Sequence, residues 1–256
     1  MKQLVVPSKR ALGRVPQQIR SCLNALRFGF VFVRARWFKM PQKIKAVGKS
    51  VALHFPPDHS VSSDFLACCI NNDYGLRRRL KNVETILDIG ANVGFFSVAA
   101  RSHYPRATIH AYEPNRRVLP FLRSNTAPLG IDIYPEAVGA HSGYVSMLDI
   151  GDSNQARTLS NGDGDILQVS LDTAVERLGG TVDLLKLDCE GAEWDMFRSE
   201  SPWLRIRNVR MEYHLFHGES VQDVEQALSG LGFETTHWRC DVRFGIVWAV
   251  RSSLSR

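Results

Sequence analysis

The sequence predicts an α/β fold in which a doubly wound, mostly parallel sheet ends in an antiparallel hairpin. The chain has 256 residues, of which 44% are hydrophobic and 23% charged, so it can bury one large core without disulfides or a structural metal. Short apolar segments alternate with amphipathic ones over most of the chain, as strands and helices do in βαβ units. The last two strand-like segments have no helix between them, which indicates a hairpin.

The N-terminal part of the chain is strongly basic. Twelve Lys and Arg precede the first acidic residue, Asp58, whereas the rest of the chain carries 20 basic and 26 acidic side chains. We therefore separate a basic N-terminal helical arm (residues 1–42) from a main domain (residues 43–256). Within the arm, Val15–Lys39 is predicted to be a helix. It either packs on the domain, which its mixed apolar spacing favours, or lies on an anionic membrane surface.

Targeting signals are weak. The longest apolar stretch of the arm, Phe28–Val33, is far too short to span a bilayer, and no signal peptide follows the basic start. The five cysteines form no C-x-x-C pair, which indicates a reducing compartment and no structural zinc. We expect a cytoplasmic protein, with peripheral membrane contact through the arm as an alternative.

The main domain is predicted to begin with a hairpin at Lys43–Phe55, which turns at Gly48–Ser50, followed by a helix at Ser62–Ile70. Strands and helices then alternate. The expected strands are Thr85–Ile89, Thr108–Tyr112, Ile131–Ala137, Gln168–Ser170, Leu184–Leu187, Asn208–Tyr213, Glu234–Arg239 and Gly245–Arg251, and the expected helices are Phe95–Ser102, Arg116–Thr126, Thr173–Leu178, Ala192–Arg198 and Val221–Leu231.

The most informative segment is the strand after residue 84 with the turn that follows it. Gly90 lets the backbone approach a ligand, and Gly94 lets the next helix pack close to the strand. Ligands of such sheets bind at the carboxyl ends of strands, so a cofactor is expected here. A dinucleotide site would need G-x-G-x-x-G, whereas Asn92 and Phe95 take the later glycine positions. The acid before the turn, Asp88, suits a cationic ligand such as S-adenosylmethionine, which carries an ammonium and a sulfonium group.

A second acid supports this interpretation. Glu113 directly follows strand Thr108–Tyr112, where a carboxylate can accept hydrogen bonds from both ribose hydroxyls. NAD sites share this acid, and a carboxylate near a helix N-terminus is also stabilised by the dipole alone. Since both motifs occur in register, we favour cofactor binding.

On these and later motifs the chain resembles the FkbM family of S-adenosylmethionine-dependent methyltransferases. The resemblance spans residues 47–250, and Lys186–Glu193 is its most specific run, with Cys189 where the family usually has Val or Ile. It implies a Rossmann-like class I methyltransferase fold. The runs that carry it are Leu87–Ser97, Tyr112–Pro114, Glu136–Gly139, Ser170–Asp172, Asp183–Glu193 and Met211–His214.

The resemblance also implies S-adenosylmethionine as the cofactor and assigns residues to its parts. The turn after the first strand would cradle the amino-acid half, the acid-proline pair after the second strand would bind the ribose, and a later loop would bind the adenine. The family typically methylates hydroxyls of sugars, glycolipids and polyketide-like products. The residues so assigned are Asp88, Gly90, Ala91, Asn92 and Gly94 for the first part, Glu113 and Pro114 for the second, and Glu136, Ala137 and Val138 for the third.

Three residues are candidates for catalysis. Methyl transfer to an alcohol needs an oxygen held in line and a base for its proton. Asp188 ends strand Leu184–Leu187 at the edge of the sheet where the cofactor is expected, and Glu190 and Glu193 follow it. These two glutamates could instead cap the next helix, but the resemblance favours a functional role for Asp188 and Glu190. His214 is either a base or a hydrogen-bonded structural residue.

No metal is expected. Asp188, Glu190, Glu212 and His214 could bind a divalent cation, but nothing in their spacing requires one. The Gly- and Asp-rich stretch Gly151–Asp165 lacks the terminal glutamate of an EF-hand and is interpreted as a loop on the substrate side.

The sequence therefore predicts an S-adenosylmethionine-dependent O-methyltransferase whose partner is a small-molecule or glycan hydroxyl. One alternative is a methyltransferase-like binding protein without activity, and the intact cofactor motif argues against it. Another is a nucleic-acid methyltransferase that holds phosphates with the basic arm. Because the body outside the arm is net acidic, we expect no nucleic-acid partner.

Overall fold

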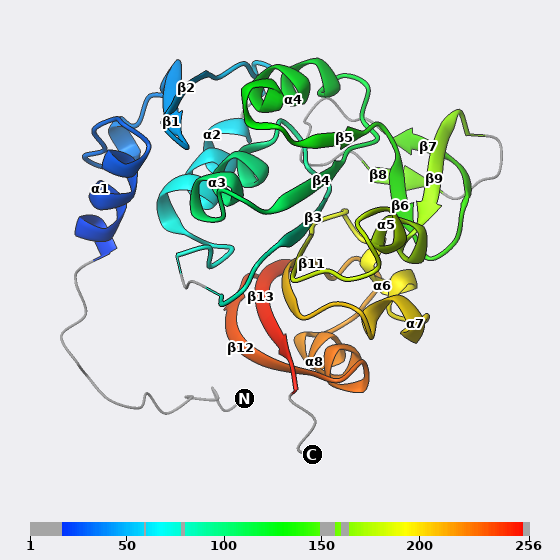
Figure 1. Ribbon diagram of the computed structural model, residues 1–256. Coiled ribbons are helices and arrows are strands. Elements are labelled where there is room, and N and C mark those ends of the chain that lie inside the picture. The colour runs from blue at the N-terminus through cyan, green and yellow to red at the C-terminus, as the bar shows by residue number, and fades with distance from the viewer. Residues whose placement is uncertain (1–16, 59, 78–79, 149–156, 160–163, 253–256) are drawn as a thin grey trace, which may run out of the picture.

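A computed structural model describes residues 17–58, 60–77, 80–148, 157–159 and 164–252 of the protein. Its centre is a seven-stranded sheet of order β12-β13-β11-β10-β3-β4-β5 (Figure 1). All neighbours from β11 to β5 are parallel, and β13 is antiparallel to both β11 and β12. The predicted doubly wound sheet with a C-terminal hairpin is thereby confirmed. The strands are β3 Thr85–Ile89, β4 Thr108–Tyr112, β5 Asp132–Tyr134, β10 Leu184–Leu187, β11 Asn208–His214, β12 Phe233–Cys240 and β13 Phe244–Arg251.

Alternate side chains of the central strands enter two different cores. On β3, Ile86 joins a cluster with Val98 of helix α3, and Leu87 joins a second cluster with Val175 of helix α5. This period of two is what a strand buried on both faces requires. The helices of the domain are α2 Val61–Phe65, α3 Phe95–His103, α4 Leu119–Thr126, α5 Leu171–Arg177, α6 Glu193–Met196, α7 Glu200–Trp203 and α8 Val221–Gly230, with the π-helix η2 Leu66–Asn71 after α2 and the 3-10 helix η3 Ala127–Leu129 after α4.

A second sheet of order β6-β9-β7-β8 lies beside the carboxyl edge of β5 (Figure 1). Here one predicted strand was wrong, and another is confirmed as a strand but belongs to this sheet. The single strand expected over Ile131–Ala137 is split, because Pro135 has no N–H to continue the ladder and the next strand, β6, belongs to the second sheet. The strand expected at Gln168–Ser170 also lies in that sheet. Its strands are β6 Ala137–Gly139, β7 Gly143–Leu148, β8 Arg157–Leu159 and β9 Ile166–Ser170.

The arm forms a shorter helix than predicted. Helix α1 covers Gln17–Arg27, whereas the prediction extended to Lys39. Gly29, at φ 80°, ends the helix, and the Phe30 N–H donates to the Ala25 carbonyl, as in a Schellman motif. The chain then runs in extended form to a short 3-10 helix, η1 Ala35–Trp37.

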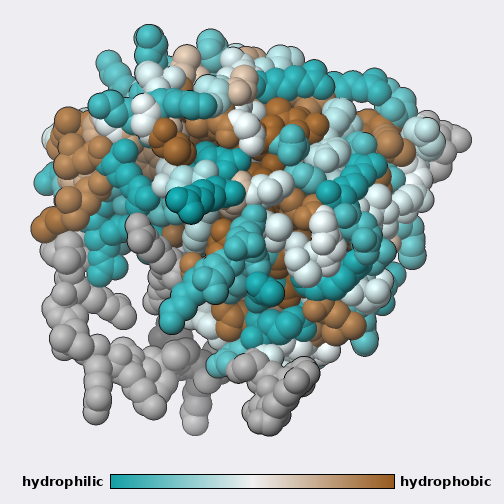
Figure 2. Space-filling model, viewed as in Figure 1, coloured by the Kyte–Doolittle hydropathy of each residue, from teal (hydrophilic) through white to brown (hydrophobic). Residues whose placement is uncertain are grey.

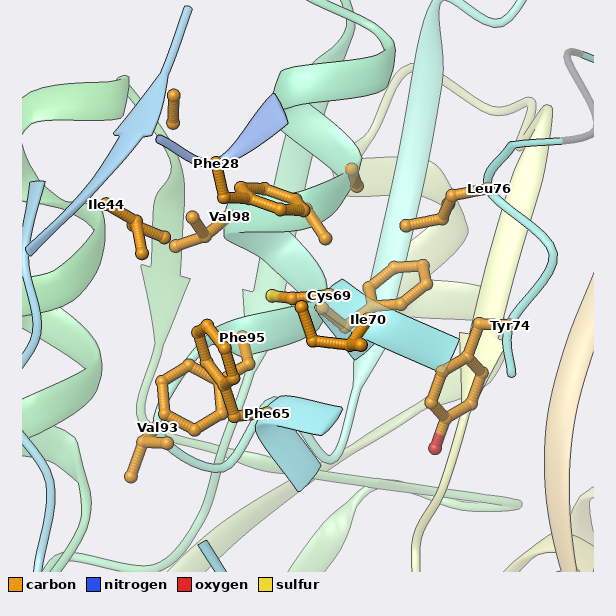
Figure 3. Packing of buried hydrophobic residues seen from close by; sticks show 14 of the residues in the cluster. Phe28, Ile44, Phe65, Cys69, Ile70, Tyr74, Leu76, Val93, Phe95 and Val98 are labelled. Carbon is orange, nitrogen blue, oxygen red and sulfur yellow. The ribbon is translucent and has the colours of Figure 1, made fainter. Parts of the chain in front are cut away.

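The arm packs on the domain, as the favoured interpretation predicted. Phe28 is 1% exposed and lies in one cluster with Val98 and Ile44 (Figure 3). The hairpin expected after it forms from β1 Lys43–Ala46 and β2 Lys49–Ala52. Among the described residues, no helix combines the length and apolarity needed to cross a membrane.

One further helix prediction needs correction. The helix expected at Ala192–Arg198 is reduced to α6, and a second short helix, α7, follows it without having been predicted.

The stretch Gly151–Asp165 was interpreted from the sequence as a substrate-side loop. Most of it lies outside the described residues, but within the described part Arg157–Leu159 forms strand β8 and is not loop.

Candidate active site

A cavity of about 640 Å³ opens at the carboxyl ends of β3, β4, β10 and β11. This is the position that the sheet topology predicts for a ligand, and the volume suits a cofactor. Eleven of the thirteen predicted site residues line it. They are Gly90, Ala91, Asn92, Glu113, Pro114, Glu136, Ala137, Val138, Asp188, Glu190 and His214.

The turn after β3 can be built only with glycine at two positions. Gly90 has φ 73°, and a Cβ there would lie 1.7 Å from the Asp188 carbonyl oxygen. Gly94 has φ 90° and begins helix α3, where a Cβ would lie 2.8 Å from the side chain of Leu122. Gly90 therefore brings the two central strand ends together under the cavity, and Gly94 lets α4 pack behind it.

Asp88 lies beneath this turn rather than in the cavity lining. Its carboxylate is fully buried, accepts a 2.6 Å hydrogen bond from the Ser97 hydroxyl and lies 3.6 Å from the Lys186 ammonium. Burial raises its pKa, and Lys186 opposes that rise. The sequence-based expectation of direct contact with a cationic ligand is not what this geometry favours, because the carboxylate supports the turn from below.

Lys186 connects the turn to the acidic side of the cavity. Its ammonium donates to the carbonyls of Ile89 and Gly90 and lies 3.3 Å from Asp188. Burial disfavours its charge, but Asp188 and Asp88 together hold its pKa above the ordinary value. Lys186 begins the most specific run of the family resemblance, but it was not predicted as a site residue. The signal that could have identified it is a lysine within an otherwise apolar strand, because a buried cation needs partners.

Glu113 is oriented by the backbone. Its Oε2 accepts from the Asn92 N–H at 2.7 Å, and its Oε1 accepts from the Asn115 N–H at 2.8 Å. Burial raises its pKa to about 7, although these two hydrogen bonds lower it. Each carboxylate oxygen keeps acceptor capacity toward the cavity, as a ribose diol would need.

The third predicted group lies at the start of β6. Ala137 and Val138 are buried and line the cavity, while Glu136 pairs with Arg177 at 2.5 Å. The ring of Tyr112, which also lines the cavity, stacks on the ring of Tyr134, with ring centroids 4.6 Å apart. This part of the cavity wall is therefore largely apolar and aromatic, which suits a flat heterocycle.

The end of β10 supplies the acids of the opposite wall. Asp188 Oδ2 accepts a 3.2 Å hydrogen bond from the Tyr74 hydroxyl and also lies 3.3 Å from the Lys186 ammonium. Glu190 has φ 53°, a left-handed conformation that non-glycine residues rarely adopt. Such strain at a cavity-lining carboxylate is typical of a functional position.

Glu193 and His214 form a fixed pair. Glu193 is fully buried, and its Oε1 accepts from the His214 backbone N–H at 2.8 Å and lies 3.2 Å from His214 Nδ1. Its Oε2 accepts from the Gly191 N–H at 2.9 Å. Glu193 thus fastens the loop after β10 to the end of β11 and sets the orientation of the imidazole.

The other ring nitrogen of His214 faces the cavity acids. Nε2 lies 3.4 Å from Glu190 and 4.0 Å from Glu212. Burial alone would lower the pKa of His214, but Glu193, Glu190 and Asp188 raise it to about 9. Burial, with Asp188 nearby, also raises the pKa of Glu212 to about 8. Near neutral pH the imidazole is therefore mostly protonated.

Two residues that line the cavity were missed from the sequence. The Tyr74 hydroxyl donates to both Asp188 and Glu212, and Asp64 accepts from the Asn92 side chain at 3.1 Å. Both come from the segment between the hairpin and β3, where no motif marks them. Asp64 is on the short helix α2, and Tyr74 is in an irregular turn.

Three side chains of the acidic wall lie close enough together to bind a metal cation. Ligand atoms of Asp188, Glu190 and His214 lie within 4.8 Å of one another. However, Asp188 already forms an ion pair with Lys186. The raised pKa of His214 also keeps its imidazole protonated at neutral pH, whereas a metal ligand must be neutral. The expectation that no metal is used therefore stays a prediction.

Comparison with known proteins decides the family. Residues 88–235 match the model of the methyltransferase FkbM domain, which is more than half of the chain. The chain belongs to the FkbM methyltransferase family. The family resemblance and fold class expected from the sequence are thereby confirmed, and the protein is a methyltransferase with S-adenosylmethionine as its cofactor.

The chain is similar to known methyltransferases. The chain is 28% identical over 209 residues to methyltransferase sdnD of Sordaria araneosa, covering 61% of this chain and 76% of the relative. It is 25% identical over 194 residues to the 31-O-demethyl-FK506 methyltransferase FkbM of Streptomyces tacrolimicus, covering 60% and 74%. Among solved structures it is similar to the magnesium protoporphyrin IX methyltransferase ChlM of Synechocystis PCC 6803, at 12% identity and a TM-score of 0.47, covering 78% of this chain and 87% of that one.

Proposed function

We propose that the protein transfers a methyl group to a hydroxyl of a sugar, glycolipid or other natural product, with His214 as the base. The observation that supports this most is the Glu193–His214 pair, because Glu193 fixes Nδ1 and leaves the second ring nitrogen, Nε2, facing the same cavity as the cofactor motif. The relative from Streptomyces tacrolimicus, named for methylation at an oxygen of FK506, agrees with an oxygen acceptor.

The cofactor fits the residues of the β3–β4 side. Any Cβ at Gly90 would collide with the Asp188 carbonyl and displace the turn that lines the cavity, and Glu113 has acceptor capacity left for a diol. S-adenosylmethionine supplies an activated methyl group when bound. Asn92, with its left-handed backbone at φ 48°, and the apolar wall at Ala137 and Val138 would hold its remaining parts.

The β10–β11 side suits an alcohol. Carboxylates accept hydrogen bonds from hydroxyl groups, and Asp188 and Glu190 both face the cavity. The hydroxyl proton passes to His214 Nε2, which Glu193 holds toward Glu190. Because an imidazole must be neutral to accept a proton, the reaction should depend on the fraction of His214 that has lost its own proton.

The test combines activity and binding. The protein is incubated with methyl-labelled S-adenosylmethionine and a panel of glycosides and polyketide alcohols, and labelled products are examined by NMR for a new O-methyl group. His214→Gln should lower kcat by about 10² or more while S-adenosylhomocysteine binds as in the wild type, measured by calorimetry. Unchanged kcat in this variant would remove His214 from the mechanism. Labelling of nitrogen or carbon instead of oxygen would overturn the proposed acceptor.

A further inference from the structure

Helix α1 has two different apolar faces. Ala25 and Phe28 are buried against the domain, on the side that also carries Ser21 and Asn24. On the opposite side, residues spaced by four and three positions form a stripe along the helix. This stripe consists of Ile19, Leu23 and Leu26, whose residues are 49%, 54% and 59% exposed. Figure 2 shows the hydrophobic side chains gathered at the left edge of the view, where α1 lies.

Further exposed apolar side chains follow the helix. Val31 and Val33 are 78% and 54% exposed, on either side of Phe32, which is 7% exposed. The Gln18 side chain donates to the Val33 carbonyl, which places this segment beside α1. Trp37 is 61% exposed, and the Arg34 guanidinium lies over its ring at 5.7 Å. We call Arg34 and the six exposed apolar residues Ile19, Leu23, Leu26, Val31, Val33 and Trp37 the arm face. Large exposed apolar side chains gathered in one part of a chain mark an interaction site.

Every charged residue of the arm and of the hairpin that follows it is basic. The first 57 residues carry twelve basic side chains and no acid. Arg27 is exposed on α1, and Lys43 and Lys45 are exposed on the neighbouring hairpin. An anionic bilayer attracts a protein surface in two ways: apolar groups are buried at the acyl boundary, and cations are drawn to the headgroups. The arm face offers both, because its apolar side chains and Trp37 are flanked by Arg and Lys.

The arm face is held rigidly on the domain. The Asn24 side chain donates to the Ile70 carbonyl of η2, and Arg27 donates to the Ser102 carbonyl at the end of α3. Because η2 continues into the cavity wall through Leu66, Ala67 and Cys68, a partner bound to the arm face would sit one helix behind the active site.

We propose that the arm face docks the protein on the surface of an anionic lipid bilayer. This goes beyond the methyl-transfer function and does not depend on it. A bilayer explains both halves of the face, whereas nucleic acid would require cations and stacking aromatics but gains nothing from Ile19, Leu23, Leu26, Val31 and Val33.

The test uses the full chain and vesicles of phosphatidylcholine with or without phosphatidylserine. We expect sedimentation with the anionic vesicles only, weakened by salt. The variant I19Q/L23Q/L26Q keeps good helix formers at exposed positions and should lower the bound fraction about tenfold. The control L204Q/V242Q removes two apolar side chains that are 67% and 87% exposed elsewhere on the surface and should bind as the wild type. Circular dichroism and S-adenosylhomocysteine binding show that each variant is folded.

Five outcomes would overturn the proposal. One is a wild-type protein that ignores anionic vesicles, and another is undiminished binding by I19Q/L23Q/L26Q. Salt-sensitive RNA binding without vesicle binding would assign the arm to nucleic acid. A dimer that the triple variant converts to monomer, or vesicle binding seen only after residues 1–16 are removed, would mean that the chain itself covers the arm face.

Discussion

The two sides of the cavity are built on different principles. The β3–β4 side is shaped by backbone: two left-handed glycines, a carboxylate held by two N–H groups, and a buried Asp88 below. The β10–β11 side is shaped by titratable side chains that contact one another, namely Asp188, Glu190, Glu212 and His214. The first arrangement is rigid and suits one constant ligand. The second changes with protonation and suits the step that removes a proton.

The most severe way to break the first side is Gly90→Ala. The added Cβ would lie 1.7 Å from the Asp188 carbonyl, which is backbone and cannot move aside. We expect loss of S-adenosylhomocysteine binding by calorimetry and a clearly lower melting temperature. Gly130→Ala is the matched control, because it also has positive φ, 62°, but open space around its Cβ, and should cost only about 1 kcal/mol. A Gly90→Ala protein that binds like the wild type would contradict the proposed cradle.

On the β10–β11 side, the rate of methyl transfer should depend on pH. His214 has a pKa of about 9, so below that value each pH unit leaves about tenfold less neutral imidazole. Single-turnover methyl transfer should therefore rise about fiftyfold between pH 7 and pH 9 and then level off. His214→Gln should give a nearly flat profile over the same range. A flat wild-type profile would instead indicate that Asp188 or Glu190 is the base.

Glu193→Gln tests the β10–β11 side further, and its effect on the rate should be smaller than that of His214→Gln. The variant removes the charge that helps to raise the pKa of His214 and sets an amide against the N–H groups of Gly191 and His214. We expect kcat at pH 9 to fall about tenfold and the midpoint of the pH profile to move to lower pH. Stability should fall by about 1–3 kcal/mol, measured by urea unfolding. A lower kcat with an unmoved midpoint would reduce Glu193 to a purely structural role.

On the cofactor side, the only strong pH effect should come from Glu113. Its pKa is about 7, and protonation turns one acceptor oxygen into a donor. The affinity for S-adenosylhomocysteine should thus fall severalfold from pH 8 to pH 6, measured by calorimetry. Glu113→Gln should bind more weakly, with little change over this range. Equal pH dependence in both proteins would rule out Glu113 as its source.

The smallest effect is expected from chelation. Lys186 already neutralises Asp188, so the acidic side has a resident cation of its own. Dialysis against EDTA should leave kcat and KM unchanged, and Mg²⁺ or Mn²⁺ should not increase them. A strong loss that a divalent cation restores would assign Asp188, Glu190 and His214 as ligands.

The sequence was most informative where topology dictates position. Strand ends such as Glu113, Asp188 and His214 were predicted at one edge, and the parallel sheet brings them there. The direction of a side chain is harder to predict, because Asp88 ends up under the turn only through its contacts with Ser97 and Lys186. Lys186 is far from Asp88 in the chain, and Ser97 lies nine positions away on the next helix.

Other features lacked any periodic signal. Tyr74 reaches the cavity from an irregular turn, so only the folded chain shows its hydroxyl between Asp188 and Glu212. The early end of α1 does have a sequence signal, since Gly29 stands just after the residue where the helix stops. The function of the arm, like the identity of the acceptor, depends on surfaces rather than on motifs.

The position of β13 has a consequence for the order in which the molecule can be assembled. This strand follows β12 along the chain but lies between β12 and β11 in the sheet, with Val247 beside Met211. As the ribosome delivers the chain, β11 must leave one edge unpaired until residues 244–251 emerge. The acidic wall, which includes Glu212 and His214 on β11, therefore reaches its final form only after residues 244–251 have been synthesised.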